Sequence, residues 1–223
     1  MHSGLVSDRS LRQLLAGLSA AGVTSTTVLG PSTTFAGKTS DTGWVVYEAA
    51  DQVTAIAPPL PAPEQARRAG FDDSTLLGIL DSSPTIAVIL VRLGRYAVGV
   101  FSQGQLVASK TDTRYVGSKH SAGGWSQQRF ARIREKQARE LYDRVCAVAG
   151  EKLMPFEKEI ERLWLGGERQ TVLGFSKRCP LLETFASRKA DRLLSVPVPD
   201  LAGLRSSYSE AMRYLVMRSR TTV

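Results

Sequence analysis

The residues best suited to do chemistry lie in the stretch 117–130, which reads GSKHSAGGWSQQRF. Six of them follow one another directly: Gly123, Gly124, Trp125, Ser126, Gln127 and Gln128. Glycines allow a positive φ and a close approach of the backbone to another molecule. A glutamine side chain offers one acceptor and two donors and has no charge to desolvate. We interpret the stretch as a glycine-rich loop with polar side chains, a pattern that purely structural loops ahead of helices also show.

Basic side chains surround this loop. The candidate RNA-binding residues are Arg114, Lys119, His120, Arg129, Arg132, Arg134 and Lys136. Between residues 110 and 144 the chain has nine Lys or Arg and four Asp or Glu, which gives a local net charge of +5 within a total of +8. This concentration favours a polyanionic partner such as RNA. Trp125 could stack on a base, or it could fold back onto a neighbouring sheet as an ordinary structural residue.

A long helix is expected to follow the loop, from Ser126 to about residue 149. Ser126 is a suitable N-cap because it comes directly after the glycines. Apolar residues at helical spacing predict one face that packs on a sheet: Phe130, Ile133, Leu141, Val145 and Val148. Basic residues three or four positions apart predict a second, positively charged face, made of Arg129, Arg132, Lys136 and Arg139.

Three strands are expected before the loop. Residues 85–93, TIAVILVRL, form a nearly continuous apolar run rich in β-branched residues, which is typical of a strand buried on both faces. Residues 95–102, RYAVGVFS, predict a second strand, and QLVASK after Gly104 predicts a third. The short spacing between the three indicates an antiparallel meander.

The last third of the chain indicates a mixed α/β organisation. We expect helical segments over residues 151–164 and 179–190, and a closing helix over residues 200–218. Residues 169–175 and 193–199 are interpreted as strands, the second of them at a sheet edge because it contains two prolines. The predicted fold class is therefore α/β, with a mixed sheet that contains the meander and has helices packed on it.

The N-terminal third is expected to be a separate part of the chain. Residues 8–20 predict a short amphipathic helix, and residues 43–58 contain two strand patterns. The segment 57–63, APPLPAP, cannot be a helix or a central strand, so it is interpreted as a linker or wrapping segment and a soft boundary. We predict an N-terminal α+β extension of unknown role in residues 1–80 and a second domain in residues 81–223.

The cysteines and histidines do not predict a metal site. Cys146 and Cys179 are the only cysteines, and neither they nor His2 and His120 form a zinc-binding pattern. Cys146 falls on the apolar side of the long helix and is interpreted as a small core residue. We find no signal-peptide pattern and no apolar run of about 18 residues. A soluble, cytoplasmic protein with reduced thiols, no cofactor and no membrane partner is expected.

Other catalytic chemistries fit the sequence poorly. Ser121 and Ser126 lie near His120, but neither serine has the strand–turn–helix G-x-S-x-G context of a hydrolase nucleophile. No Gly-Lys-Ser/Thr follows the glycines, which argues against a phosphate-binding loop. A metal-dependent nuclease would need a cluster of acidic ligands, whereas the long helix carries mostly basic residues around the loop.

The stretch KHSAGGWSQQRFARIRE, residues 119–135, resembles the central loop of the eukaryotic and archaeal class-I peptide chain release factors. The middle domain of that family has a Lys-His pair, a Gly-Gly-Gln tip, a serine, and Arg-Phe-x-Arg-x-Arg at the start of a long helix. The residues at matching places are Lys119, His120, Gly123, Gly124, Ser126, Arg129, Phe130, Arg132 and Arg134. The resemblance is close over residues 95–148 and loose to residue 218, and it implies a ribonuclease-H-like middle-domain fold.

One position departs from the family pattern. Trp125 stands where the release factors have their catalytic glutamine, so the release-factor mechanism does not transfer directly. Another branch of the superfamily, the release-factor-like tRNA hydrolases of ribosome quality control and their actinobacterial relatives, resembles the chain more closely. That branch has an Arg-Tyr-Thr/Val before the loop, here residues 114–116, and a Ser-Ala-Gly within it, here residues 121–123. Its catalytic glutamine is shifted along the loop, which implies Gln127 or Gln128 here.

The resemblance implies a function in ribosome rescue. The expected activity is metal-independent hydrolysis of the peptidyl-tRNA ester, with a glutamine that positions water and with the large ribosomal subunit and peptidyl-tRNA as partners. Hydrolysis of this ester, which releases the peptide, needs an ordered water and stabilisation of developing negative charge. The alternative is a non-catalytic rescue factor that binds the ribosome or RNA, which the tryptophan at the tip favours. A monomer is expected, and the choice between Gln127 and Gln128 stays open.

Overall fold

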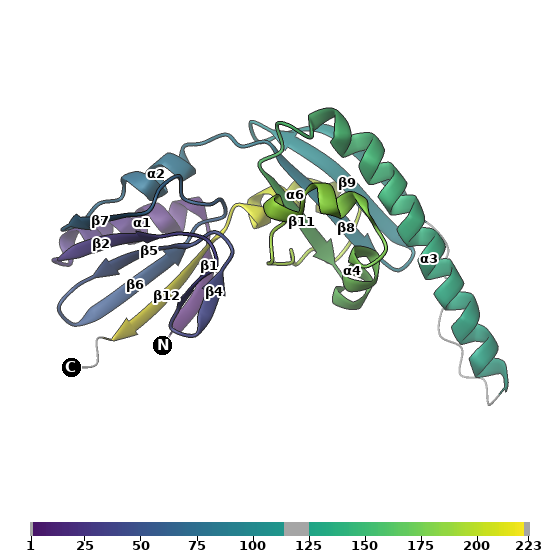
Figure 1. Ribbon diagram of the computed structural model, residues 1–223, viewed down its shortest axis with the longest axis horizontal. Coiled ribbons are helices and arrows are strands. Elements are labelled where there is room, and N and C mark those ends of the chain that lie inside the picture. The colour runs from purple at the N-terminus through teal and green to yellow at the C-terminus, as the bar shows by residue number, and fades with distance from the viewer. Residues whose placement is uncertain (1, 114–124, 221–223) are drawn as a thin grey trace. The chain divides into compact units, whose positions relative to one another are not determined.

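The computed structural model describes residues 2–113 and 125–220, with the side chains of residues 2 and 125–131 outside that description (Figure 1). It divides into two compact units. One contains residues 1–82 and 211–223, and the other contains residues 83–210. Residues 211–220 therefore belong to the N-terminal unit, whereas the sequence placed them in the second domain.

The N-terminal unit is built on a six-stranded antiparallel sheet in the order β1-β12-β6-β5-β2-β7. Its strands are β1 (His2–Val6), β2 (Ser25–Leu29), β5 (Trp44–Glu48), β6 (Gln52–Ala57), β7 (Ala66–Ala69) and β12 (Tyr214–Arg220). A hairpin of β3 (Thr33–Phe35) and β4 (Lys38–Ser40) is added. The helices of this unit are α1 (Asp8–Ala20) and α2 (Ser74–Leu80).

The predicted elements of the N-terminal unit are confirmed, but the predicted boundary at residues 57–63 is wrong. The amphipathic helix is α1, which buries three of its four leucines, and the two strand patterns are β5 and β6. The proline-rich segment lies inside the unit, between β6 and β7, where Leu60 is buried and the Pro58 carbonyl accepts the Thr42 hydroxyl at 2.7 Å. It is a packed crossover between two strands of one sheet.

The second unit contains a four-stranded mixed sheet in the order β10-β9-β8-β11. The strands β8 (Ile86–Arg92), β9 (Arg95–Ser102) and β10 (Gln105–Thr113) form the predicted antiparallel meander, and β11 (Arg162–Gly167) is parallel to β8. The helical segments are α3 (Trp125–Leu153), η1 (Met154–Phe156), α4 (Arg169–Ser176), α5 (Leu181–Thr184), η2 (Ala186–Arg188) and α6 (Leu201–Ala211). The predicted mixed α/β class is confirmed.

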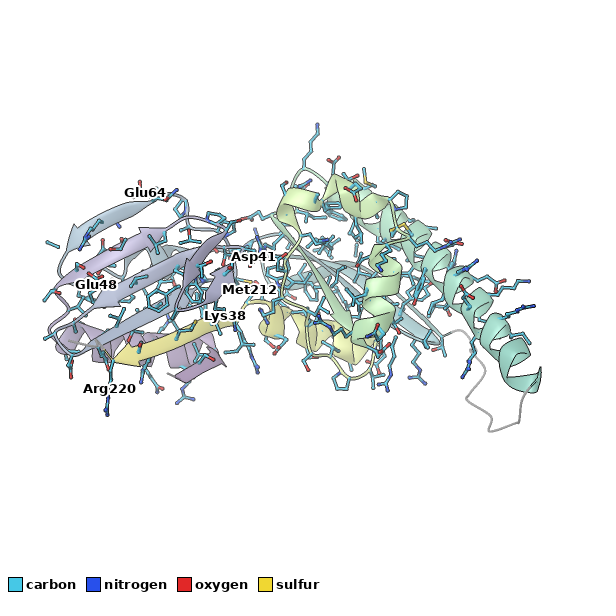
Figure 2. All side chains as sticks on the ribbon, turned by 60° about the horizontal axis from the view of Figure 1, so that its bottom comes forward. Lys38, Asp41, Glu48, Glu64, Met212 and Arg220 are labelled. Carbon is cyan, nitrogen blue, oxygen red and sulfur yellow. A yellow bond between two sulfur atoms is a disulfide. The ribbon has the colours of Figure 1, made fainter. Side chains whose placement is uncertain are left out.

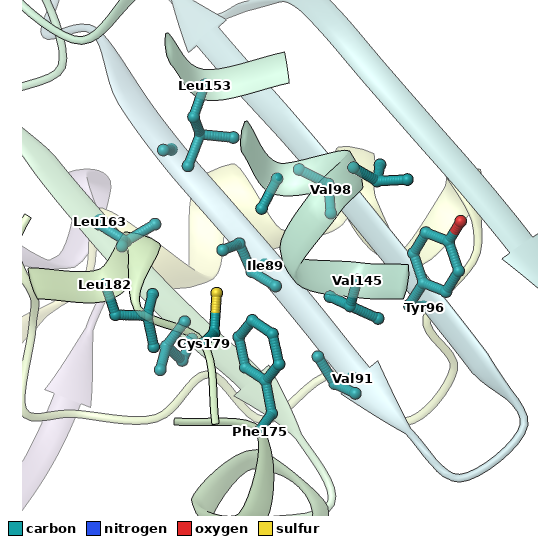
Figure 3. Packing of buried hydrophobic residues seen from close by; sticks show 14 of the residues in the cluster. Ile89, Val91, Tyr96, Val98, Val145, Leu153, Leu163, Phe175, Cys179 and Leu182 are labelled. Carbon is teal, nitrogen blue, oxygen red and sulfur yellow. The ribbon is translucent and has the colours of Figure 1, made fainter. Parts of the chain in front are cut away.

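Helices cover both faces of this sheet, which explains the continuous apolar run of β8. Every residue from Ile86 to Val91 is fully buried. On one face, Ile89 and Val91 pack with Val145 of α3 and Phe175 of α4 (Figure 3). On the other face, the Phe101 and Tyr208 rings lie 5.3 Å apart between β9 and α6. A strand between two helical layers has no polar face to present, so its sequence does not alternate.

The predicted long helix is confirmed and is longer than expected, from Trp125 to Leu153. Ser126 lies inside this helix, one residue after its start, so its assignment as the N-cap is wrong. Leu141, Val145 and Val148 face the sheet as predicted, but Ile133 is 42% exposed. The reason is that α3 extends past the sheet, so its first half has no sheet to cover (Figure 1).

Four predictions for the last third are wrong. Residues 151–164 are helical only as far as Phe156, and residues 162–164 belong to strand β11, which pairs with β8. Residues 169–175 form helix α4 because the Glu168 carboxylate accepts the Gln170 and Thr171 N–H groups as an N-cap. Residues 193–199 make only an isolated bridge, between Leu194 and Gly166, because two prolines interrupt any ladder. Residues 200–218 are helix α6 followed by strand β12, which pairs with β1 and β6 far back in the sequence.

The prediction of reduced cysteines is also wrong in this structure. Cys146 of α3 and Cys179, which lies between α4 and α5, form a disulfide (Figure 2). Cys179 is buried in the core, and Cys146 is partly buried against it. Periodicity located Cys146 correctly on the inner face of the helix, but it could not show that Cys179 packs opposite it.

The turn from β11 to α4 depends on Gly167. Its φ is +113°, and a Cβ added there would lie 2.2 Å from the Val91 carbonyl oxygen. We expect Gly167→Ala to lower the free energy of unfolding by about 1–3 kcal/mol, because the backbone would be strained at that φ. Chemical denaturation measures the change.

Gly150 provides the matched control for that variant. It lies within α3, and an added Cβ would meet no atom within 4 Å. Gly150→Ala should be neutral or stabilise the protein by up to about 1 kcal/mol, since alanine favours a helix. Equal stability of the two alanine variants would show that Gly167 has no special conformational role.

Candidate functional site

The candidate site lies where strand β10 ends and helix α3 begins. Residues 114–124 lie outside the described residues, and with them Arg114, Lys119, His120, Gly123 and Gly124. The next residues lie in the first turns of α3, although their side chains are not described: Trp125, Ser126, Gln127, Gln128 and Arg129. The described side chains among the predicted site residues are those of Arg132, Arg134 and Lys136.

The first half of α3 forms a projecting arm, here defined as residues 125–140. None of its described residues from Arg132 to Glu140 is buried, whereas Leu141 is fully buried. The arm extends beyond the sheet of its own unit (Figure 1). Gln127 and Gln128 therefore lie in the helical turn at the far end of this arm, and two residues separate them from the glycine pair in sequence.

The predicted basic face of the arm is exposed, but acidic neighbours accompany part of it. Arg132 and Lys136 are both exposed. The Lys136 ammonium lies 4.0 Å from the Glu140 carboxylate, and Arg139 forms an ion pair with Glu135 one turn earlier. Such exposed pairs contribute at most about 1 kcal/mol. The lysine and the arginine can therefore exchange these partners for other anions at small cost.

The base of the arm is fixed to the rest of the unit. Arg178 donates two hydrogen bonds to Asp143, at 2.6 and 2.8 Å, and this guanidinium lowers the pKa of the Asp143 carboxyl. The disulfide from Cys146 to Cys179 connects the same two segments. Leu141 and Val145 add apolar contacts with the core. Covalent, ionic and apolar contacts therefore set the direction in which the arm leaves the unit.

The end of β10 is fixed by Tyr96, Asp112 and Arg144. The Tyr96 hydroxyl donates to the Asp112 carboxylate at 3.4 Å, and the other Asp112 oxygen accepts the Thr113 N–H at 2.8 Å. Burial and the charge of Asp112 raise the pKa of Tyr96, while a hydrogen bond and the charge of Arg144 oppose the increase. One cluster thus connects β9, the end of β10 and helix α3 on either side of residues 114–124.

Sequence reasoning did not find this cluster. Tyr96 was interpreted as part of an apolar strand, and Arg144 only as one of the basic residues. The signal available in the sequence was Asp112, an aspartate between the third predicted strand and the glycine-rich segment. In the described part of the chain, no three His, Cys, Asp or Glu side chains gather where they could hold a metal ion. No helix among the described residues has the length and apolar content of a membrane span.

Comparison with known proteins gives several similarities. Residues 84–217, more than half of the chain, match the family model described as actinobacteria/chloroflexi VLRF1 release factor. Over 118 residues the chain is 29% identical to peptide chain release factor subunit 1 of Archaeoglobus fulgidus, which covers 52% of the chain and 29% of that relative. The same subunit of Picrophilus torridus is 26% identical over 124 residues, which covers 56% of the chain and 30% of the relative.

A solved structure is also similar, that of the archaeal translation termination factor aRF1. The TM-score is 0.46 at 16% sequence identity, and the match covers 92% of this chain and 72% of that chain. The chain spans less than a third of the length of the two peptide chain release factor subunits named above.

Proposed function

Since the chain belongs to the actinobacterial and chloroflexi VLRF1 release factor family, we propose that it hydrolyses the ester bond of peptidyl-tRNA on stalled ribosomal complexes. The resemblance of the chain to class-I release factors is confirmed by the family match over residues 84–217 and by the archaeal relatives. The chain is therefore a member of a release-factor-like family of translation and ribosome rescue. The reaction, its substrate and its residues are our proposal.

One structural observation carries this proposal. Helix α3 begins at Trp125, so Gln127 and Gln128 lie in its first turn, at the end of an arm and shortly after the glycine pair in sequence. An enzyme that works inside another large particle must reach into it, and an arm with a fixed base does this. A small polar side chain at the far end can then enter a confined site without the cost of desolvating a charge.

The proposed mechanism is water positioning by a glutamine amide. A water oxygen attacks the ester carbonyl carbon, the bond to the tRNA 3′ oxygen breaks, and a proton is transferred to that oxygen. The glutamine carbonyl accepts a hydrogen bond from the water, and its amide N–H groups can donate to developing negative charge. The surrounding RNA supplies the remainder of the site, and no covalent intermediate with the protein forms.

The proposed setting is the large ribosomal subunit in the cytoplasm, with the protein acting as a monomer. Basic residues of the arm would contact RNA phosphates through charge-assisted hydrogen bonds. The deciding experiment is release of the nascent chain from purified 50S–peptidyl-tRNA complexes, with and without this protein. Accelerated release supports the hydrolase, whereas binding of the complex with no release supports the alternative.

That alternative is a non-catalytic rescue factor which binds the same complexes. One observation favours it, namely that Trp125 occupies the position where the resembling release factors have their catalytic glutamine. The two functions predict the same binding surface and differ only in turnover. Release by the wild-type protein therefore decides between them.

We expect the basic face of the arm to bind RNA phosphates. The double variant Arg132→Glu, Lys136→Glu should weaken binding to the large subunit and lower the slope of log K against log salt by about 0.7 for each phosphate contact that is lost. Sequence of the RNA should matter little, because phosphate contacts carry no sequence information. Filter binding at several KCl concentrations measures both quantities.

The double variant Lys177→Glu, Arg205→Glu is the matched control. It makes the same change of charge at two exposed residues of the same unit that are not part of α3. This control should keep most of the affinity and the slope. Equal losses in both double variants would mean that net charge, and not the arm, governs binding.

A further inference from the structure

A pocket of about 530 Å³ lies beside the arm, within the second unit. Its walls come from the β8–β9 turn, from α3 and from the start of α4. The residues that define it for this argument are Arg92, Leu93, Arg134, Tyr142, Glu168 and Gln170. This volume is in the range of small-ligand sites, and nothing in the proposed release reaction uses the pocket.

The acidic side chains of the pocket already have partners. The Glu168 carboxylate caps α4 by accepting the N–H groups of Gln170 and Thr171 at 3.2 and 3.0 Å, and it also accepts the Thr171 hydroxyl. These bonds lower the pKa of Glu168, the Thr171 hydroxyl first among them. Glu135, the other acid of the wall, forms its ion pair with Arg139. The two carboxylates are thus held by existing contacts.

The basic and aromatic side chains give the pocket a defined preference. The Arg92 guanidinium is held by a 2.8 Å hydrogen bond to the Pro197 carbonyl, and Arg134 enters from α3. Tyr142 is packed edge-on against Phe175, with ring centroids 6.4 Å apart. Burial raises the pKa of Tyr142, and the charge of Glu168 adds to this, so its hydroxyl is a neutral hydrogen-bonding group. Leu93, which is 48% exposed, adds an apolar wall.

We infer that this pocket receives one unpaired nucleotide of an RNA strand that lies along the arm. Its phosphate would pair with Arg134 and Arg92, its base would lie against Tyr142 and Leu93, and the Gln170 amide would meet the polar edge of the base. Two arginines, an aromatic ring and an amide are the groups that recognise splayed-out single-stranded bases. The inference rests on the proposed function for its choice of an RNA partner.

The position of the pocket agrees with such a strand. Arg134 lies nine residues after Trp125, and at 1.5 Å per residue this places it about 14 Å along the helix from the start of the arm. Arg134 is two residues away from both Arg132 and Lys136, about 200° around the helix, so the pocket opens on another face of α3 than these two basic residues. An RNA strand that contacts the first turn of α3 would reach the mouth of the pocket along the side of the helix that carries Arg134. The pocket therefore adds a base-dependent contact to an otherwise phosphate-based surface.

The test compares two fluorescent single-stranded oligoribonucleotides of equal length, one with all bases and one with abasic sites. We expect the wild-type protein to bind the first about tenfold more tightly in anisotropy titrations, the effect of one stacked base. Gln170→Ala should reduce this ratio towards one, whereas Arg134→Gln should weaken the binding of both oligonucleotides, because both contain the phosphates. Arg205→Gln, an exposed arginine on α6, should leave the ratio unchanged, and thermal unfolding should show that all variants are folded.

Each outcome decides the inference. Equal wild-type affinity for the two oligonucleotides overturns it, and so does a ratio that survives Gln170→Ala or an unchanged affinity of Arg134→Gln for both oligonucleotides. Binding of a free mononucleotide as tight as that of the oligonucleotide also overturns it, since a strand along the arm would then add nothing. Cross-linking from position 170 in stalled complexes then distinguishes ribosomal RNA from tRNA as the source of the nucleotide.

The outcome is independent of the release reaction. Peptide release by the wild-type protein without a preference for bases would reject the pocket and keep the proposed function. A preference for bases without any peptide release would support the pocket and reject the proposed hydrolysis.

Discussion

Gln127→Ala, Gln128→Ala, or both are expected to lower the rate of peptide release by about 10²–10³-fold without unfolding the protein. This is the usual loss when one well-placed transition-state hydrogen-bonding group is removed. Both glutamines lie in the first turn of α3, which begins at Trp125. We favour Gln127, because it is nearer to the glycines in sequence. Since alanine favours a helix at least as well as glutamine, α3 should keep its start in either variant.

The measurement is single-turnover release of a labelled nascent chain at saturating protein, where defects in binding no longer contribute to the rate. Gln13→Ala is the matched control, because Gln13 is an exposed glutamine on another helix, α1. Trp125→Ala should raise the concentration of protein needed for saturation more than it lowers the rate, since stacking contributes mainly affinity.

Two results would change the assignment. A wild-type rate in the double variant Gln127→Ala, Gln128→Ala would show that neither amide takes part in the reaction. Absence of release by the wild-type protein under the same conditions would favour the non-catalytic rescue factor. The arm would then serve only for binding, and the charge-reversal variants described above would still weaken it.

Local patterns predicted the elements that carry the candidate site. The apolar run at residues 85–93 and the two following strands became β8, β9 and β10 because each pairs with its neighbour in sequence. The helical spacing of Leu141, Val145 and Val148 predicted helix α3 because its second half packs on that meander. In both cases, the backbone hydrogen bonds that form the element join residues close in the chain, and its buried face appears directly as the spacing of its apolar residues.

Other features depend on contacts between distant residues, and local patterns do not contain them. Residues 214–218 were interpreted as part of a helix, yet they lie in strand β12 because β1 and β6 offer edges on both sides. Ile133 was placed in the core because its spacing fits the helical pattern, but the sheet ends before it. The cluster of Tyr96, Asp112 and Arg144 needs three elements to meet. For Gln127 and Gln128, the proposed catalytic role came from the resemblance to a family, because residue spacing alone did not indicate one.

The disulfide is the feature that most directly changes the expected behaviour of the protein. Disulfides are uncommon in cytosolic proteins, and this is why the sequence predicted reduced thiols. Cys146 and Cys179 are 33 residues apart. Closing a loop of that length restricts the unfolded chain and stabilises the folded state by about 3–4 kcal/mol in the chain-entropy model. Loss of the bond should therefore affect the stability of the second unit strongly.

We expect the double variant Cys146→Ala, Cys179→Ala to lower the free energy of unfolding by at least about 3 kcal/mol, because the loop-closure contribution is lost together with some packing in the core. Reduction of the wild-type protein with dithiothreitol should lower it by the loop-closure part alone. Denaturant titrations measure both changes, and dithiothreitol should have no effect on the double variant.

A thiol titration of the unfolded, unreduced protein provides the direct check. Two free thiols there would mean that the cysteines are unpaired, and the arm of α3 would then be fixed at its base by the Asp143–Arg178 pair and the apolar contacts of Leu141 and Val145.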